Sequence, residues 1–168
     1  MNTSTRFLRQ SAEYLREYQA KIERCLGDLT DEQLWYRPND QSNSIGNLVL
    51  HLCGNIRQWI GEGVGGKPYP RQRQQEFDER IPVQRSELLS RLRSTLDEAT
   101  DALSRLTPDD LVEMRTIQAR TLTVMEAIYH AVEHFAMHTG QIIWITKAQT
   151  ASNLHFYDVS GGHPKKNW

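Results

Sequence analysis

The stretch HAVEHFAMHTGQ, residues 130–141, carries His130, His134 and His138, which are half of the six histidines in the chain. Each of these histidines follows the previous one by four residues, slightly more than one turn of an α-helix. A helix would therefore present all three side chains along one side. The spacing predicts a helix with a histidine stripe, and the stripe raises the question of a metal site.

The rest of the chain predicts three more long helices and no strand of any length. Apolar residues recur at helical spacing in the first helix, for example at Leu8, Leu15, Ile22 and Leu26. Good N-cap residues precede the second and fourth helices, and TVME at residues 123–126 is a capping box. The expected helices span residues 4–29, 45–60, 86–106, and from 121 or 123 to about 150. A short helical turn is expected at residues 30–38, between Thr30 as N-cap and Pro38.

Residues 61–82, GEGVGGKPYPRQRQQEFDERIP, form the long connection between the second and third helices and are rich in Gly, Pro and charge. A structureless connection of this length is uncommon in a compact domain and is usually a lid, a binding loop or a mobile segment. Four helices of similar length predict an all-α four-helix bundle, with residues 1–168 as a single domain. Such bundles build metal sites from side chains that face inward on different helices.

The composition limits the classes of partner. The formal net charge is −1 and charged residues make up 24% of the chain, so we expect neither nucleic acid nor membrane as a partner. The first residues lack the apolar segment of a secretory signal, and no apolar run of about 18 residues is present. Cys25 and Cys53 lie far apart without a CxxC motif, so we expect reduced, packed thiols in a cytoplasmic protein.

Geometry leaves two histidine pairs open. Histidines four residues apart lie about 6 Å apart along the helix axis, so either His130 with His134 or His134 with His138 can share one ion. His130 and His138 lie about 12 Å apart along the axis, too far for all three to bind one metal. Spacing alone does not choose between the two pairs.

A third ligand would come from another helix, and His51 is the candidate. On a helical projection of the second helix, His51 falls at the edge of the apolar arc, beside Asn55 and Gln58. A histidine there could point into a partly wet cavity, or it could simply bond to a backbone carbonyl. The arc itself comprises Ile45, Leu48, Val49, Leu52, Ile56, Trp59 and Ile60.

A competing motif overlaps the histidine stripe. His130, Glu133 and His134 spell H-x-x-E-H, the inverted zinc-protease signature in which the glutamate acts as a base. Proteases of that kind take a carboxylate ligand far downstream, and after Glu133 this sequence has no glutamate and only Asp158. Glu133 also lies about 100° around the helix from His134, away from the stripe. The protease interpretation is therefore disfavoured.

The segments SIGNLVLHLCGNIRQWI, FDER and VEHFAMHTGQIIWITK resemble the DinB/YfiT-like family of four-helix metalloproteins, over nearly the whole chain. In that family a histidine midway along the second helix joins two histidines of the last long helix as three facial ligands, with water in the open positions. The resemblance therefore implies His51, His134 and His138 as metal ligands and leaves His130 near the site. It also implies a link to transferases and isomerases that use bacillithiol or mycothiol.

A three-histidine site with open positions would be catalytic rather than structural. Its borderline ligands suit Zn, Ni and Fe alike, so the expected cofactor is a divalent ion of unspecified identity. Metal affinity should fall as the pH drops through about 6.5, the ordinary pKa of histidine. Two functions are carried forward: a metal-dependent thiol transferase or hydrolase acting on a small electrophile, and a non-catalytic metal- or small-ligand-binding bundle.

Other residues are candidates for binding a substrate. Arg71, Arg73 and Arg80 in the long connection could grip the carboxylate of a low-molecular-weight thiol, although a solvated charged loop is the other interpretation. Gln141 lies on the stripe about 20° from His134 and is expected to face the same cavity. Tyr157 is a further candidate for orienting a ligand. The expected partners are a small-molecule substrate and, as a homodimer, a second copy of the chain.

Overall fold

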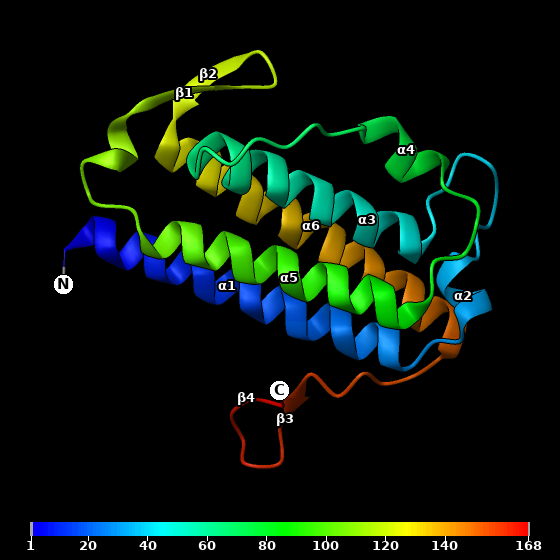
Figure 1. The fold of residues 1–168 in the computed structure, drawn as a ribbon. Coiled ribbons are helices and arrows are strands. Elements are labelled where there is room, and N and C mark those ends of the chain that lie inside the picture. The colour runs from blue at the N-terminus through cyan, green and yellow to red at the C-terminus, as the bar shows by residue number, and fades with distance from the viewer. Residues whose placement is uncertain (1, 168) are drawn as a thin grey trace.

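Four long helices form the bundle in the computed structural model, which describes residues 2–167. Figure 1 shows them side by side, and both α1 and α3 contact α5 and α6. The all-α four-helix bundle expected from the sequence is confirmed. The long helices are α1 (Thr3–Gly27), α3 (Ile45–Ile56), α5 (Arg85–Ser104) and α6 (Val124–Thr150).

Local signals define where the helices begin. Thr30, Ser44 and Thr123 are the N-caps of α2 (Asp31–Trp35), α3 and α6, and each forms a capping box with the residue at the third helical position. These side chains satisfy amides that have no partner inside the helix. The predicted beginnings of the three helices are therefore confirmed.

The apolar stripes identified in the sequence form the core. All four residues of the stripe in α1 and all seven of the apolar arc predicted for the second helix are buried. Cys25 and Cys53 are buried and unpaired, as expected of packed thiols. Leu88, Leu92 and Leu96 of α5 and Ala127, Ala131 and Phe135 of α6 complete the core between the helices.

The second helix is longer than predicted because it continues as a π-helix, η1 (Arg57–Val64). This stretch contains Gly61 and Gly63, which lower the cost of departing from α-helical geometry. At Gly63 a Cβ atom would lie 2.2 Å from Cδ1 of Ile117, so the glycine also lets another element pack closely. π-Helical turns are rare in proteins, and those that do occur often lie at functional sites.

A short helix interrupts the long connection. Residues 73–78 form α4 (Arg73–Asp78), which contacts α3 and lies beside it in Figure 1. The composition suggested a structureless segment. The structure instead contains a helix within it. It is held against the bundle by hydrogen bonds to side chains of other elements, which a local sequence pattern does not reveal.

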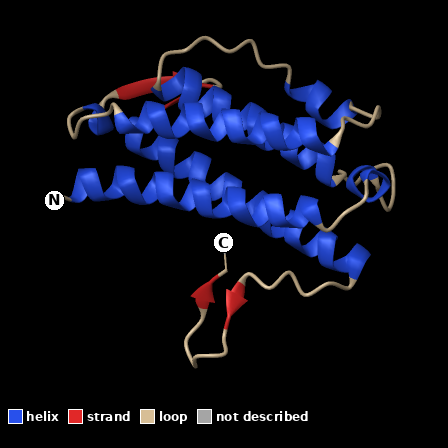
Figure 2. Ribbon diagram, turned by 60° about the horizontal axis from the view of Figure 1, so that its bottom comes forward, coloured by secondary structure: helices blue, strands red, loops and turns tan. Residues whose placement is uncertain are grey.

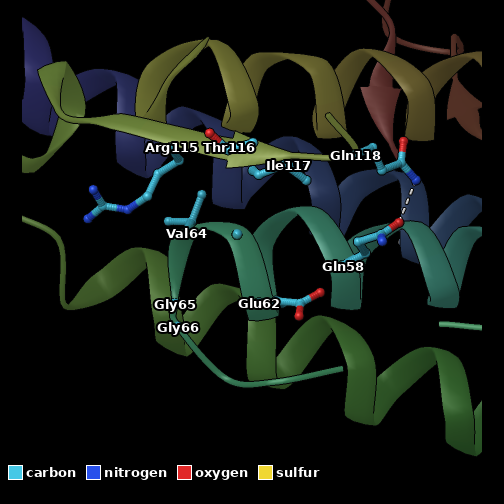
Figure 3. Close-up of a pocket in the computed structure, with 10 residues that line it drawn as sticks. Gln58, Glu62, Val64, Gly65, Gly66, Arg115, Thr116, Ile117 and Gln118 are labelled. Atoms are coloured by element: carbon cyan, nitrogen blue, oxygen red, sulfur yellow. Dashed lines mark hydrogen bonds between the residues drawn. The ribbon is translucent and has the colours of Figure 1, made fainter. Parts of the chain in front are cut away.

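A β-hairpin also departs from the prediction of no strands. β1 (Met114–Ile117) and β2 (Arg120–Thr123) pair antiparallel after a turn of 3₁₀-helix, η2 (Asp110–Val112). The turn residues Gln118 and Ala119 both have positive φ, the backbone of a type I′ hairpin. Figure 3 shows the hairpin over η1, with Gln118 bonded to Gln58.

The C-terminal tail runs back along the bundle and ends in a two-residue strand pair, β3 (Tyr157–Asp158) with β4 (Lys165–Lys166) (Figure 2). Its attachment is to α1, because Arg24 Nη1 donates to the carbonyl of His155 over 2.9 Å and Lys166 pairs with Glu17. Among the described helices, none combines the length and apolar composition needed to cross a membrane.

Candidate metal centre

His51, His134 and His138 converge between α3 and α6. One ring nitrogen of each lies within 4.8 Å of one ring nitrogen of both others. The ring centroids of His134 and His138 are 4.5 Å apart, and that of His51 lies 5.0 and 5.1 Å from them. The three residues implied by the resemblance are therefore brought together, and a group of this kind could hold a metal ion.

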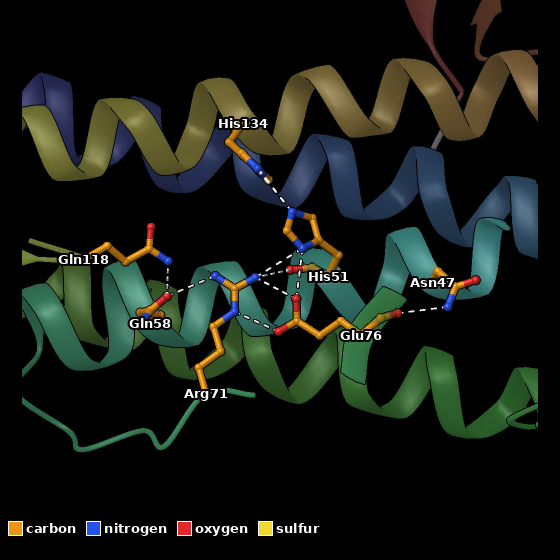
Figure 4. Close-up of polar contacts among 7 residues, drawn as sticks. All are labelled: Asn47, His51, Gln58, Arg71, Glu76, Gln118 and His134. Atoms are coloured by element: carbon orange, nitrogen blue, oxygen red, sulfur yellow. Dashed lines mark hydrogen bonds and ion pairs between the residues drawn. The ribbon is translucent and has the colours of Figure 1, made fainter. Parts of the chain in front are cut away.

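His51 is buried rather than placed at a wet border. Its side chain is 3% exposed because α4 covers it: the ring of Phe77 packs on it at a tilt, 4.6 Å away between centroids, and Glu76 contacts Nδ1. Glu76 Oε2 lies 2.9 Å from Nδ1 of His51, and Nε2 of His51 lies 3.3 Å from Nε2 of His134 (Figure 4). The long connection thus covers part of the site.

Glu76 contacts the histidine cluster, and no sequence pattern predicted this contact. Arg71 binds its carboxylate with two parallel hydrogen bonds, Nε to Oε1 and Nη2 to Oε2, both 2.7 Å long. Burial alone raises the pKa of Glu76, but hydrogen bonds from Arg71 and His51 bring this pKa below its usual value. The carboxylate is therefore ionised, and a neutral His51 must carry its proton on Nδ1 to donate to it.

His138 has an equivalent arrangement at its own Nδ1. This atom lies 2.7 Å from the amide oxygen of Gln141, which can only accept, so Nδ1 donates and Nε2 keeps its lone pair. The expectation that Gln141 faces the histidines is confirmed. Two of the three imidazoles thus have one nitrogen fixed by a polar partner and the other available.

His134 is within contact distance of both other histidines. Its Nδ1 is buried and has no hydrogen-bond partner among the described residues. Burial first, and then the neighbouring His138 and His51, lower the pKa of His134 to about 3. The pKa of His138 is lowered as well, chiefly by burial. Both imidazoles stay neutral at physiological pH, the form that binds a metal, and down to a lower pH than the 6.5 expected from the sequence.

The residues fit a divalent ion by their donor chemistry. The fixed Nδ1 protons of His51 and His138 leave their Nε2 lone pairs available, and the Nε2 atoms of His51 and His134 face each other. Metal-bound histidines usually donate their other ring N–H to a carboxylate or carbonyl oxygen, as Glu76 and Gln141 allow here. Three imidazole ligands match the preferences of Zn, Ni and Fe.

His130 stands one turn away and does not join the group. Its ring lies 5.8 Å from that of His134 and packs on Trp59 of η1 at 4.2 Å, measured between centroids. Glu133, the base of the H-x-x-E-H interpretation, is exposed to solvent. The geometry does not support the protease interpretation, since neither His130 nor Glu133 is part of the cluster.

The arginines expected to grip a substrate have other partners. Arg71 is 3% exposed and is occupied by Glu76. Arg73 lies over the ring of Phe77 at 5.0 Å, and Arg80 donates to the carbonyls of Phe77 and Glu79. The interpretation of Arg71 as a substrate clamp is therefore wrong, because its charge is used to hold Glu76.

The structure does not bring Tyr157 to the histidines. This residue lies on β3 in the tail, against α1, where the ammonium of Lys21 is 5.8 Å from its ring centroid. The histidines lie between α3 and α6, away from the tail. The C-terminal tail has no apolar periodicity, so the sequence carries no information on where the side chain of Tyr157 would lie.

The comparison with protein families agrees with the resemblance found in the sequence. The model of the family described as "Protein of unknown function (DUF1572)" matches residues 2–163. The chain belongs to this family. DUF1572 is DinB-like, so the resemblance to the DinB/YfiT-like family is confirmed. No curated protein matches the sequence of this DUF1572 member.

Solved structures share the fold of this DUF1572 protein at low sequence identity. A DinB-like protein from Bacillus cereus is 19% identical, with a TM-score of 0.66 over 88% of this chain and 93% of that chain. The mycothiol-dependent maleylpyruvate isomerase is 14% identical, with a TM-score of 0.63 over 84% of this chain and 63% of that chain. A colibactin self-resistance protein, solved in complex with a double-stranded DNA, is 16% identical. Its TM-score is 0.63 over 83% of this chain and 95% of that chain.

Proposed function

We propose that this DUF1572 protein binds one divalent metal ion through His51, His134 and His138 and transfers a thiol to a small electrophile, or hydrolyses one. The observation that carries the proposal is the approach of three imidazole nitrogens to within 4.8 Å of one another. When bound, an ion with three neutral ligands and open positions acidifies a coordinated water or binds a thiol as thiolate. Zn, Ni and Fe are equally suited.

The thiol would come from a cosubstrate. Burial raises the pKa of Cys25 and of Cys53 to about 11, so neither is an accessible thiolate. The likeness to a mycothiol-dependent isomerase supports a low-molecular-weight thiol as that cosubstrate. The likeness to a protein solved with DNA gives less support to a nucleic-acid substrate, since the net charge of this chain is −1.

A cavity beside Gln141 offers room for the electrophile. It measures about 750 Å³, within the range of small-molecule sites. Met137 and Trp144 of α6 and Leu48 of α3 give it an apolar lining, and Gln141 connects it to His138. Trp144 is 71% exposed, and a small apolar or aromatic electrophile would cover part of its ring. We propose that such a molecule binds here.

His130 favours a catalytic over a purely binding role. Its imidazole stands beside His134 without belonging to the cluster, so its nitrogens are available to accept or donate a proton. Burial lowers the pKa of His130, which keeps the ring neutral and able to act as a base. The non-catalytic metal- or ligand-binding bundle is the alternative function, and it gives His130 no chemical task.

Metal analysis and a thiol-consumption assay test the proposal together. Purified protein is loaded with Zn, Ni or Fe and incubated with a low-molecular-weight thiol and a panel of apolar and charged electrophiles. We expect one ion per chain and metal-dependent consumption of the thiol with apolar electrophiles. An ion without turnover of any electrophile would favour the non-catalytic bundle, and no bound ion would refute the proposal. The expected homodimer is tested separately, by light scattering.

A further inference from the structure

We infer that Glu76 is a positioning residue for His51, seated against Gly54 and clamped by Arg71, so that residues 71–76 of the long connection fix the tautomer of the buried histidine. The inference deepens the proposed function, because His51 is one of the three proposed ligands. The arrangement itself is a property of the metal-free protein and is testable without a metal.

Gly54 provides the space for the carboxylate. A Cβ atom at this position would lie 2.0 Å from Oε1 of Glu76 and 3.0 Å from Nε of Arg71. Glycine in the interior of a helix is less favourable than alanine, so its presence in α3 calls for a compensating reason. Gly54 follows His51 by three residues and therefore shares its side of the helix. The absent side chain lets the carboxylate lie flat against the helix beside the ring.

Arg71 fixes the orientation of that carboxylate. The guanidinium binds both oxygens of Glu76, and such forked pairs are stronger and geometrically more specific than single hydrogen bonds. Its remaining Nη1 donates to Oε1 of Gln58 on η1 over 3.0 Å, and Gln118 of the hairpin donates to the same oxygen (Figure 4). Arg71 thus connects the carboxylate, through Gln58, to η1 and to the hairpin.

Asn47 holds the backbone on which Glu76 is carried. Its Nδ2 donates to the carbonyl of Glu76 over 2.9 Å and to that of Glu79 over 3.2 Å. Arg37 adds a bond of 2.9 Å to the carbonyl of Phe77. The carboxylate is therefore restrained at both ends, by its backbone and by its charge partner.

The consequence is a defined tautomer at His51. Arg71 Nη2 also lies 3.2 Å from Nδ1 of His51, and this donor alone would favour a lone pair on Nδ1. The ionised carboxylate at 2.9 Å requires a proton there instead, and Arg71 Nη2 donates to Oε2 of Glu76 at 2.7 Å. With the proton on Nδ1, the lone pair of Nε2 points toward His134. Without Glu76 the ring would be free to take the opposite tautomer.

The test compares Gly54→Ala with Gly61→Ala as a matched control. A Cβ at Gly61 meets no atom within 4 Å, so that variant makes the same change in the same continuous helix without displacing Glu76. ¹⁵N NMR of the histidine rings of metal-free protein, assigned with His51→Gln, reports the tautomer of His51. We expect the Nδ1–H tautomer in the wild type and in Gly61→Ala, and a shift toward Nε2–H in Gly54→Ala and Glu76→Ala.

Circular dichroism confirms that each variant is folded. An Nε2–H tautomer at His51 of the wild type would overturn the inference, and so would a folded Glu76→Ala that keeps the Nδ1–H tautomer. If Gly54→Ala does not fold, Arg71→Ala replaces it, because it releases the carboxylate without adding an atom; an unchanged tautomer in that variant would likewise overturn the inference.

Metal affinity gives a second, independent readout. Competition with a chelator should show Zn bound about 10–100-fold more weakly by Glu76→Ala than by the wild type, the range for removal of a partner of a metal ligand. The Co(II) absorption spectrum should change in the same variant and stay unchanged in Gly61→Ala. A wild type with the Nδ1–H tautomer and no affinity for metal would refute the proposed function alone, whereas equal affinities of wild type and Glu76→Ala would refute the positioning role.

Discussion

Glu76 and His51 are separated by 25 residues, yet a 2.9 Å hydrogen bond joins the carboxylate of one to Nδ1 of the other. The bond links a short helix in the long connection to the middle of α3. It makes the long connection part of the site. It also leaves Nε2 of His51 facing the histidines of α6. The chemistry proposed for the bundle therefore depends on a segment that carries none of the three histidines.

Asn47→Ala should loosen that segment. The substitution removes two hydrogen bonds to the carbonyls of residues 76 and 79, and the half of the capping box in which the Asn47 side chain accepts from the backbone of Ser44. Loss of a buried partner costs about 1–3 kcal/mol, so we expect a decrease of that order in the free energy of unfolding. Urea denaturation measures it. Asn39→Ala, at an exposed turn, is the control, and an equal loss in both variants would contradict this role of Asn47.

The two cysteines should be unreactive in the folded protein. The pKa of each thiol is about 11, so pH 8 lies about three units below it and only roughly 0.1% of each thiol is thiolate. Both side chains are also buried. We expect a chromogenic thiol reagent to react with neither until denaturant is added, after which both should react. Rapid reaction of one thiol under native conditions would show that the protein carries its own nucleophile.

The metal-free protein should lose stability between pH 7.5 and pH 5. The pKa of His134 is lowered from 6.5 to about 3, so folded His134 stays neutral while the unfolded chain binds a proton below pH 6.5. Its contribution is therefore complete above pH 6.5 and is lost as the pH falls toward 3. Urea denaturation at the two pH values measures the loss. His134→Gln should show a smaller loss, and an identical loss would argue against a buried neutral imidazole.

Much of the bundle could be predicted from local signals. The capping boxes at Thr30 and Thr123 and the apolar spacing of α1 and α3 act within one or two turns, so they are legible in the sequence. The histidine stripe of α6 was legible for the same reason. Choosing His138 over His130 required the family resemblance, because helical spacing allows both pairs.

The missed features depend on contacts that are distant in sequence or on unusual backbone. The hairpin turn places Gln118 and Ala119 at positive φ, where Asn and Gly are the usual signals. Glu76 belongs to the site through Arg71 and Asn47, which no local pattern links. One signal was available: Gly54, three residues after His51 in the interior of a helix, indicates a close approach by another group.

The metal content of His138→Ala and His130→Ala, measured side by side, tests the central claim most directly. Both variants remove one imidazole from the same face of α6, so each controls for the other. We expect His138→Ala to lose the ion, because two remaining imidazoles hold a borderline metal weakly. His130→Ala should keep one ion per chain, with an affinity loss of at most about 10–100-fold, and should lose turnover. An empty His130→Ala beside a loaded His138→Ala would contradict the proposed ligand set.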